Sequence, residues 1–202
     1  MKKALLALRK NTWTGVRAML VFTVLLGVVY PLVMTGIGQL FFPRQSNGSL
    51  LRATDGAVVG SSLIGQSFSD AHGNPLPQYF QPRLSTHDYD GKASGGSNLG
   101  PENLDLITRI KQLKTDIAAF DGVSEAEVPP DAVTESASGL DPDISPAYAA
   151  IQVSRVAAAR GLSPDQVRVL VLANTRGRDL GFMGEPRVNV VTLNLALDQL
   201  TA

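Results

Sequence analysis

The sequence predicts an α+β protein with a single N-terminal transmembrane helix followed by one mixed α/β extracytoplasmic domain. Three observations support this fold class. Residues 18–43 form an apolar run without any charge, strand-like segments around a turn follow it, and the rest repeats its apolar residues every three or four positions. Strands followed by a series of helices are typical of α+β folds. The expected organisation is a basic N-terminus (1–17), the transmembrane helix (18–43) and the domain (44–202).

The apolar run is long enough to cross a bilayer. A helix over its 26 residues would be about 39 Å long, which exceeds the roughly 30 Å hydrocarbon core. A secretory signal peptide is the alternative, but its apolar region covers about 7–15 residues and is followed by small residues. Here the run ends in the bulky stretch QLFFPRQ. The segment is therefore expected to remain as an uncleaved anchor.

Proline and glycine residues modify this predicted helix. Pro31 removes one backbone donor and is expected to kink the helix, which membrane helices tolerate when neighbours compensate. Gly27, Gly36 and Gly38 leave flat places where another helix could approach closely. These three glycines are the candidate subunit interface.

The charge distribution predicts the orientation. Lys2, Lys3, Arg9, Lys10 and Arg17 precede the span without any acid, so the N-terminus should stay in the cytoplasm and the domain should be periplasmic. The expected location is the bacterial inner membrane, with one span. From Arg44 onward the chain has 13 basic and 18 acidic residues and a net charge of −5, which argues against binding nucleic acid. The chain contains no cysteine, so disulfides and thiolate chemistry are excluded.

Local signals predict the elements of the exported domain. Residues 49–65 are expected to form a strand pair around Asp55-Gly56, and residues 79–85 a short extended segment. Three helices should follow, each with a defined start or an apolar stripe. They are a helix over 104–120 with Pro101 at its start, one over 146–160 capped by Ser145, and one from Pro164 with Ser163 and Gln166 as a capping box. A last helical stripe covers 188–200, and the acidic stretch before Ser145 should be an irregular connection.

The domain contains only weak sequence signals for a catalytic, metal or phosphate site. His72 and His87 lie beside Asp70, Asp88 and Asp90, but their spacing is unlike that of zinc sites and favours a solvated loop. Ser136 and Ser138 lack the nucleophile-elbow sequence, and the histidines are far upstream, which favours a turn. The SGGSN sequence has no lysine after its glycines, which argues against a phosphate loop. No catalytic residue and no metal ligand is therefore assigned.

Several longer strings carry a family resemblance. They are YPLV in the span, FFPRQSNGSL after it, GSSLIGQSF at 60–68, ASGGSNL at 93–99, VTESASGLDPDISPAYAAIQVSRVAAARG from 133, and VNVVTLNLALDQL near the end. In this order they resemble the C subunit of the Kdp-type potassium-transporting P-type ATPase over nearly the whole chain. One departure is Leu84, where the family usually has proline.

The resemblance implies a complex in the membrane. Its partners would be a channel-like potassium-binding subunit (KdpA), an ATP-hydrolysing subunit (KdpB) and a small peptide subunit (KdpF), together with membrane lipid. The C subunit is needed for assembly and activity and is described as a catalytic chaperone that raises the ATP affinity of the ATPase subunit. This chain lacks the D-K-T-G-T phosphorylation motif, so it should be a non-catalytic subunit without a tightly bound cofactor. ATP and potassium would be handled by the complex.

One short motif bears on a nucleotide role. The sequence LSPDQ at 162–166 resembles the L-S-G-G-Q signature of ABC transporters, which would make Ser163 and Gln166 candidate nucleotide-binding residues. Pro164 has no N–H for a phosphate and Asp165 would repel it, so a capped helix start is the favoured interpretation. A nucleotide-assisting subunit and a structural or gating cap over the potassium entrance both stay open. An unrelated anchored periplasmic adaptor is the remaining alternative.

Overall fold

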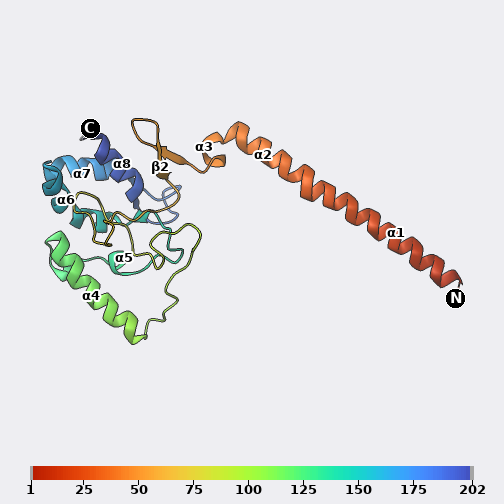
Figure 1. Cartoon of the computed structure of the whole chain (residues 1–202), viewed down its shortest axis with the longest axis horizontal. Coiled ribbons are helices and arrows are strands. Elements are labelled where there is room, and N and C mark those ends of the chain that lie inside the picture. Colours follow the sequence, from red (N-terminus) through yellow and green to blue (C-terminus); the bar gives the residue numbers. More distant parts are fainter. Residues whose placement is uncertain (1, 201–202) are drawn as a thin grey trace. The chain divides into compact units, whose positions relative to one another are not determined.

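The computed structural model describes residues 2–200 and divides into two compact units, Met1–Ser49 and Leu50–Ala202. The first unit is a helical rod (Figure 1). It consists of α1 (Lys2–Val24), a π-helical turn η1 (Leu25–Val29), α2 (Tyr30–Phe41) and the short α3 (Pro43–Ser46). The segment Arg9–Phe41 is long and apolar enough to cross a membrane, in agreement with the predicted anchor.

Pro31 was expected to kink the helix, and the structure shows a local change in the helical hydrogen-bond pattern before it. Helical structure continues through it, and the disturbance takes the form of the π-helical turn immediately before α2. The rod ends at Phe41 because Phe42 leaves the helical region, with φ −134° and ψ 51°. A π-helical turn inside an α-helix accommodates one extra residue in the hydrogen-bond ladder.

The second unit begins with the predicted hairpin, which is confirmed. β1 (Leu50–Arg52) pairs antiparallel with β2 (Val58–Ser61). The turn between them contains Gly56 at φ +84°, and the Asp55 carboxylate accepts the Ala57 N–H at 2.9 Å. The left-handed backbone at Gly56 explains why the Asp-Gly pair marks the turn.

The predicted helices are present, and only the predicted place of Pro101 in the first turn of one helix is wrong. α4 (Leu104–Asp121) is capped by Asn103, whose side chain accepts the N–H groups of Asp105 and Leu106. Pro101 therefore lies before the cap and not in the first turn. Ile110, Leu113 and Ile117 pack on the core, whereas Leu104 at the start of the stripe is 77% exposed.

The C-terminal helices follow their capping signals. Ser145 caps α6 (Pro146–Arg160), whose end at Gly161 has φ +66°, and Ser163 caps α7 (Pro164–Ala173). α8 (Val190–Leu200) closes the described chain. α6 packs against both α4 and α7, and α7 packs against α8 (Figure 1).

A small antiparallel sheet was not predicted. Its strand order is β3–β5–β4, formed by Asp143–Ile144, Arg187–Asn189 and Thr175–Arg176. The acidic connection is also more ordered than expected, since it contains the 3-10 turn η2 (Glu125–Glu127), α5 (Pro130–Val133) and β3. One core unites these elements, centred on fully buried Phe80, Val156, Val167, Leu193 and Leu197.

Candidate functional site

The segment from Pro77 to Gln81 forms the first part of the site. Its backbone hydrogen bonds are made by buried side chains, where a neighbouring strand would make them in a sheet. The Asn194 side chain accepts the Phe80 N–H and donates to the Phe80 carbonyl, both at 2.9 Å. Gln152 does the same for the next residue, accepting the Gln81 N–H at 2.6 Å and donating to its carbonyl at 3.1 Å. Two amides from α6 and α8 therefore satisfy both backbone groups of two consecutive residues.

Arg155 extends this network. Its guanidinium donates to Asp121 at 2.7 Å, to the carbonyls of Pro77 and Tyr79 at 2.6 and 2.9 Å, and to the Gln152 side chain at 2.7 Å. Burial raises the pKa of the Asp121 carboxyl, and the hydrogen bond and charge of Arg155 act in the opposite direction. The Arg155–Asp121 ion pair is nearly inaccessible to solvent, with side-chain exposures of 7% and 2%. It links α4, α6 and the Pro77–Gln81 segment.

The loop from Thr134 to Asp143 forms the second part. Arg83 donates to the Glu135 carbonyl at 3.0 Å and to the Asp141 carboxylate at 3.2 Å. The Ser136 N–H donates to the Leu84 carbonyl at 3.0 Å, next to the parallel bridge between Leu84 and Glu135. The segment predicted to be extended at 79–85 is thus joined to the loop at its C-terminal end.

Ser136 and Ser138 stabilise this loop from inside. Their hydroxyl oxygens are 3.2 Å apart, and the Ser136 hydroxyl accepts the Asp141 N–H at 3.3 Å. Ser136 is 1% exposed. These partners are those of a turn, and among the described residues neither serine hydroxyl hydrogen-bonds to a histidine.

The glycines of the SGGSN sequence pack against the same loop. Gly139 has φ +67°, and a Cβ atom there would lie 2.7 Å from the Gly95 carbonyl oxygen. A Cβ at Gly96 would lie 3.3 Å from two carbonyl oxygens of the loop. The Gly95 N–H and the Ser94 hydroxyl both donate to the Ser138 carbonyl, at 2.9 and 3.0 Å. Close backbone packing explains the absence of side chains here.

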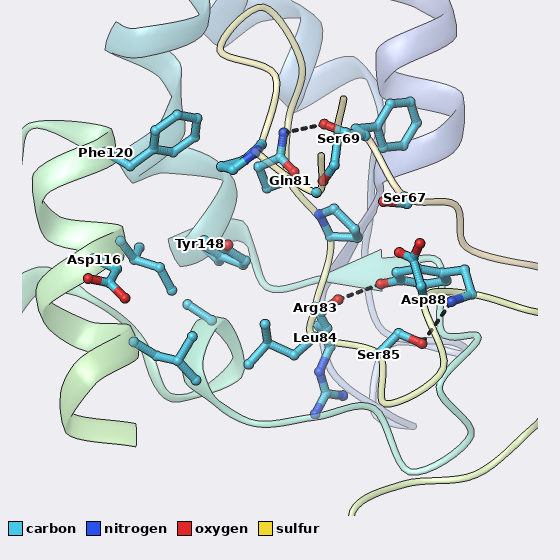
Figure 2. Close-up of a pocket in the computed structure, with 18 of the residues that line it drawn as sticks. Ser67, Ser69, Gln81, Arg83, Leu84, Ser85, Asp88, Asp116, Phe120 and Tyr148 are labelled. Carbon is cyan, nitrogen blue, oxygen red and sulfur yellow. Dashed lines mark hydrogen bonds between the residues drawn. The ribbon is translucent and has the colours of Figure 1, made fainter. Parts of the chain in front are cut away.

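A cavity of about 370 Å³ lies along the segment from Gln81 to Ser85 (Figure 2). α4 provides Asp116 and Phe120 along one side, Ser67 and Ser69 lie on the opposite side, and Tyr148 of α6 lies between them. Burial raises the pKa of the Tyr148 hydroxyl far above its usual range. The cavity has the size and mixed lining of a small-ligand pocket.

Half of the eight acidic side chains in the stretch 116–143 are paired with arginines that lie outside it in sequence. Four of its carboxylates form ion pairs with distant arginines: Asp121 with Arg155, Glu135 with Arg109, Asp141 with Arg83 and Asp143 with Arg187. Others serve the fold, because Asp131 accepts the N–H and hydroxyl of Ser145 at 2.7 and 2.8 Å.

Ser163 and Gln166 are brought together as a reciprocal cap. The Ser163 N–H donates to Gln166 Oε1 at 2.9 Å and the Gln166 N–H donates to Ser163 Oγ at 3.2 Å. The capping box is therefore confirmed, and a nucleotide contact of these residues stays a prediction. Neither residue lines the cavity of Figure 2.

The histidines lie apart from any metal-like cluster in the described range. The His72 N–H donates to Asp70 at 2.8 Å, and Asn74 donates to the same carboxylate. Within residues 2–200 no three His, Asp or Glu side chains come close enough to hold a metal ion.

The three glycines of the span do not share one face. Gly36 and Gly38 are two residues apart, which separates them by about 200° around a helix. A Cβ at Gly38 would lie 2.9 Å from Ser46 Oγ, so α3 already occupies that position, whereas nothing lies within 4 Å at Gly27 and Gly36. Their role as a subunit interface stays a prediction, with Gly27 and Gly36 open to a neighbour on their own sides.

Comparison with known proteins assigns the chain to a family. The family model for the K+-transporting ATPase c chain (KdpC) matches residues 12–199. A potassium-transporting ATPase KdpC subunit of Kineococcus radiotolerans is 50% identical over 199 residues, covering 98% of this chain and 97% of the relative. KdpC subunits of Koribacter versatilis and Caulobacter vibrioides are 47% and 53% identical, covering 95% and 88% of this chain and 95% and 87% of the relatives. The chain therefore belongs to the KdpC family of K+-transporting ATPase subunits.

Proposed function

We propose that this chain is the non-catalytic accessory subunit of a high-affinity, ATP-driven potassium uptake pump and is needed for its assembly and activity. The match to the c-chain family over residues 12–199 is the observation that carries this proposal. A single apolar span in front of an ordered domain supports a subunit that associates with others both within and outside the membrane. The partners are a channel-like potassium-binding subunit, an ATP-hydrolysing subunit and a small peptide subunit, and the complex itself handles ATP and potassium.

The proposal includes a periplasmic location for the domain. The basic residues before the span support this orientation. A reporter that is active only in the periplasm, fused after residue 202, should be active. A silent periplasmic reporter together with an active cytoplasmic reporter at the same position would contradict the orientation.

The catalytic-chaperone role fits best as an indirect effect on the ATPase subunit. Ser163 and Gln166 use their side chains to cap α7, and a periplasmic domain would lie across the bilayer from cytosolic ATP. We therefore infer that any increase in ATP affinity is transmitted through subunit contacts. The alternative is a structural or gating cap over the potassium entrance, without influence on nucleotide binding.

An exposed apolar loop supports subunit contact by the domain. Leu180, Phe182 and Met183 are 83%, 71% and 51% exposed at the tip of the loop between β4 and β5. Paired backbone hydrogen bonds between Asp179 and Met183, both 2.9 Å, hold the tip in a defined shape. Such apolar side chains on an ordered loop are typical of interaction surfaces.

Reconstitution tests the proposed function. The ATPase and channel subunits should co-purify and show potassium-stimulated ATP hydrolysis with this chain, and both properties should be lost without it. The dissociation constant for ATP of the isolated ATP-hydrolysing subunit, measured in detergent with and without this chain, separates the two versions. It should fall when the chain is added only if the chaperone role is correct. A fully active complex without the chain would contradict the proposal.

A further inference from the structure

The π-helical turn and Pro31 together leave the Leu26 carbonyl without a backbone donor in either the α or the π register. The Tyr30 N–H donates to the Leu25 carbonyl, five residues back. In a regular α-helix this N–H would serve Leu26. The next residue is Pro31, which has no N–H and so cannot serve Leu26 in the π register or Gly27 in the α register. The Leu26 carbonyl therefore receives no hydrogen bond from Tyr30 or from Pro31, the residues that could donate to it in the α and π registers.

No side chain of the described span replaces this donor. The run from residue 18 to residue 43 contains no charge, and the only side chain in it with a hydrogen bond is Gln39, which pairs with Asn47. Leu26 lies nine residues after Arg17 and fifteen before Phe41, or about 13 and 22 Å along a helix. This depth is in the hydrocarbon core, where an unpaired carbonyl is strongly unfavourable and water is scarce.

The surface around Leu26 is open to another helix. A shallow groove along one face of the rod is lined by Ala18, Met19, Phe22, Thr23, Leu26 and Gly27. Gly27 lies at the C-terminal end of this groove and has no side chain to fill it. No atom lies within 4 Å of the position that a Cβ would take there. A second backbone could therefore approach closely at the level of the Leu26 carbonyl.

We propose that the Leu26 carbonyl accepts a hydrogen bond from a hydroxyl or amide side chain on a transmembrane helix of another subunit, which lies in this groove. The partial negative charge of the carbonyl requires a complementary donor, and a polar side chain of a neighbouring helix can supply one at this depth. The inference deepens the proposed function, because it rests on the chain being part of a membrane complex.

Isotope-edited infrared spectroscopy tests the proposal on the full chain. A semisynthetic chain with a 13C=18O label at the Leu26 carbonyl is measured alone in lipid vesicles and again in the assembled complex. The stretching frequency should fall on assembly as the hydrogen bond forms. A label at Leu20, in the regular part of α1, is the matched control and should not shift.

The substitution Pro31→Ala provides a second readout. With an N–H at residue 31 a regular α-helix can form, in which the Tyr30 N–H serves the Leu26 carbonyl. The Leu26 frequency should therefore already be low in vesicles and should not change on assembly. The variant should associate roughly three- to twenty-fold more weakly, the range expected for loss of one hydrogen bond between membrane helices. Val21→Ala, at an exposed position that does not line the groove, should leave association unchanged.

The outcomes separate this inference from the proposed function. If the wild-type chain assembles but the Leu26 frequency does not fall, the carbonyl is not a docking site and the subunit role stands. A frequency that is already low in vesicles would show that water or lipid serves the carbonyl, which also overturns the inference. If the wild-type chain does not assemble at all, both the subunit role and the inference are wrong.

Discussion

The side chain of Gln152 hydrogen-bonds to both backbone groups of Gln81, although the two residues are 71 positions apart in the chain. The amide lies on α6, is fully buried and also accepts a bond from Arg155 at 2.7 Å. It therefore connects the helical part of the domain to an extended segment that belongs to neither sheet. Buried polar networks of this kind are strongly stabilising only when every member is paired.

Gln152→Ala should destabilise the domain severely. The substitution would leave the Gln81 backbone groups buried without partners and open a cavity, with an expected loss of about 3 kcal/mol in the free energy of unfolding. Denaturant unfolding of the full chain in detergent measures it. Gln112→Ala is the control, because that exposed amide makes one hydrogen bond, to Asp116, and should cost less than about 0.5 kcal/mol. Similar losses for the two variants would show that the backbone of Gln81 does not depend on Gln152.

Gly139→Ala should disturb the loop from Thr134 to Asp143. Its backbone has φ +67°, and the new Cβ would lie 2.7 Å from the Gly95 carbonyl oxygen, so both strain and a clash oppose the substitution. We expect a loss of roughly 1–3 kcal/mol, visible as a lower midpoint of denaturant unfolding. Gly177→Ala is the matched control, because nothing lies within 4 Å of that position. A midpoint equal to that of the control would contradict the close packing.

The Glu135 carboxylate predicts a pH dependence of stability. Burial acts to raise its pKa, but hydrogen bonds from Thr86 and Ser97 and the charge of Arg109 outweigh it, and the pKa lies below the usual 4.5. A lowered folded-state pKa contributes stability that is complete above about pH 4.5 and is lost as the pH falls through the folded value. Unfolding measured between about pH 3 and 6 should therefore show a shallower decline for Glu135→Gln than for the wild type.

The control for this prediction is the exposed Glu102→Gln, which should follow the wild-type profile. If the profile of Glu135→Gln also coincides with that of the wild type, the ion pair with Arg109 does not contribute to the acid sensitivity.

Local signals explain which elements could be predicted. Ser145-Pro146 and Ser163-Pro164 mark helix starts. The serine side chain accepts a free backbone N–H of the first turn, and the proline at the first position has no N–H that would need a partner. The Asp55-Gly56 pair similarly defines the hairpin. These features depend only on neighbours in the chain, so a single sequence contains the information. The place of Pro101 was wrong because Pro101 and Asn103 are both acceptable start signals, and Asn103 has the cap geometry.

The missed features depend on distant partners. β3 and β4 have two residues each, which is too short for alternation to be visible. Arg155 and its partner Asp121 are separated by 34 positions in the sequence, and Asn194 and Phe80 by 114 positions. No rule based on local spacing could pair them. The ion pairs of the acidic stretch could not be predicted for the same reason, since Arg83, Arg109 and Arg187 lie outside it in sequence. Buried Asn194 and Gln152 within apolar helical stripes were the available signal that polar partners were needed.

The cap at Ser163 and Gln166 provides the test that separates structure from nucleotide contact. Ser163→Ala removes the acceptor of the Gln166 N–H and should cost about 1 kcal/mol in the free energy of unfolding. Gln166→Ala removes the return bond to the Ser163 N–H and should cost a similar or smaller amount. Because both side chains act within one helix end, neither variant should change the Michaelis constant for ATP of the assembled pump, measured in detergent where both sides are accessible. Asp165→Ala is a useful comparison, since it changes the same turn but leaves the reciprocal cap in place. A several-fold rise in the Michaelis constant for ATP in Gln166→Ala, with unchanged unfolding, would overturn the capping interpretation and support direct nucleotide contact.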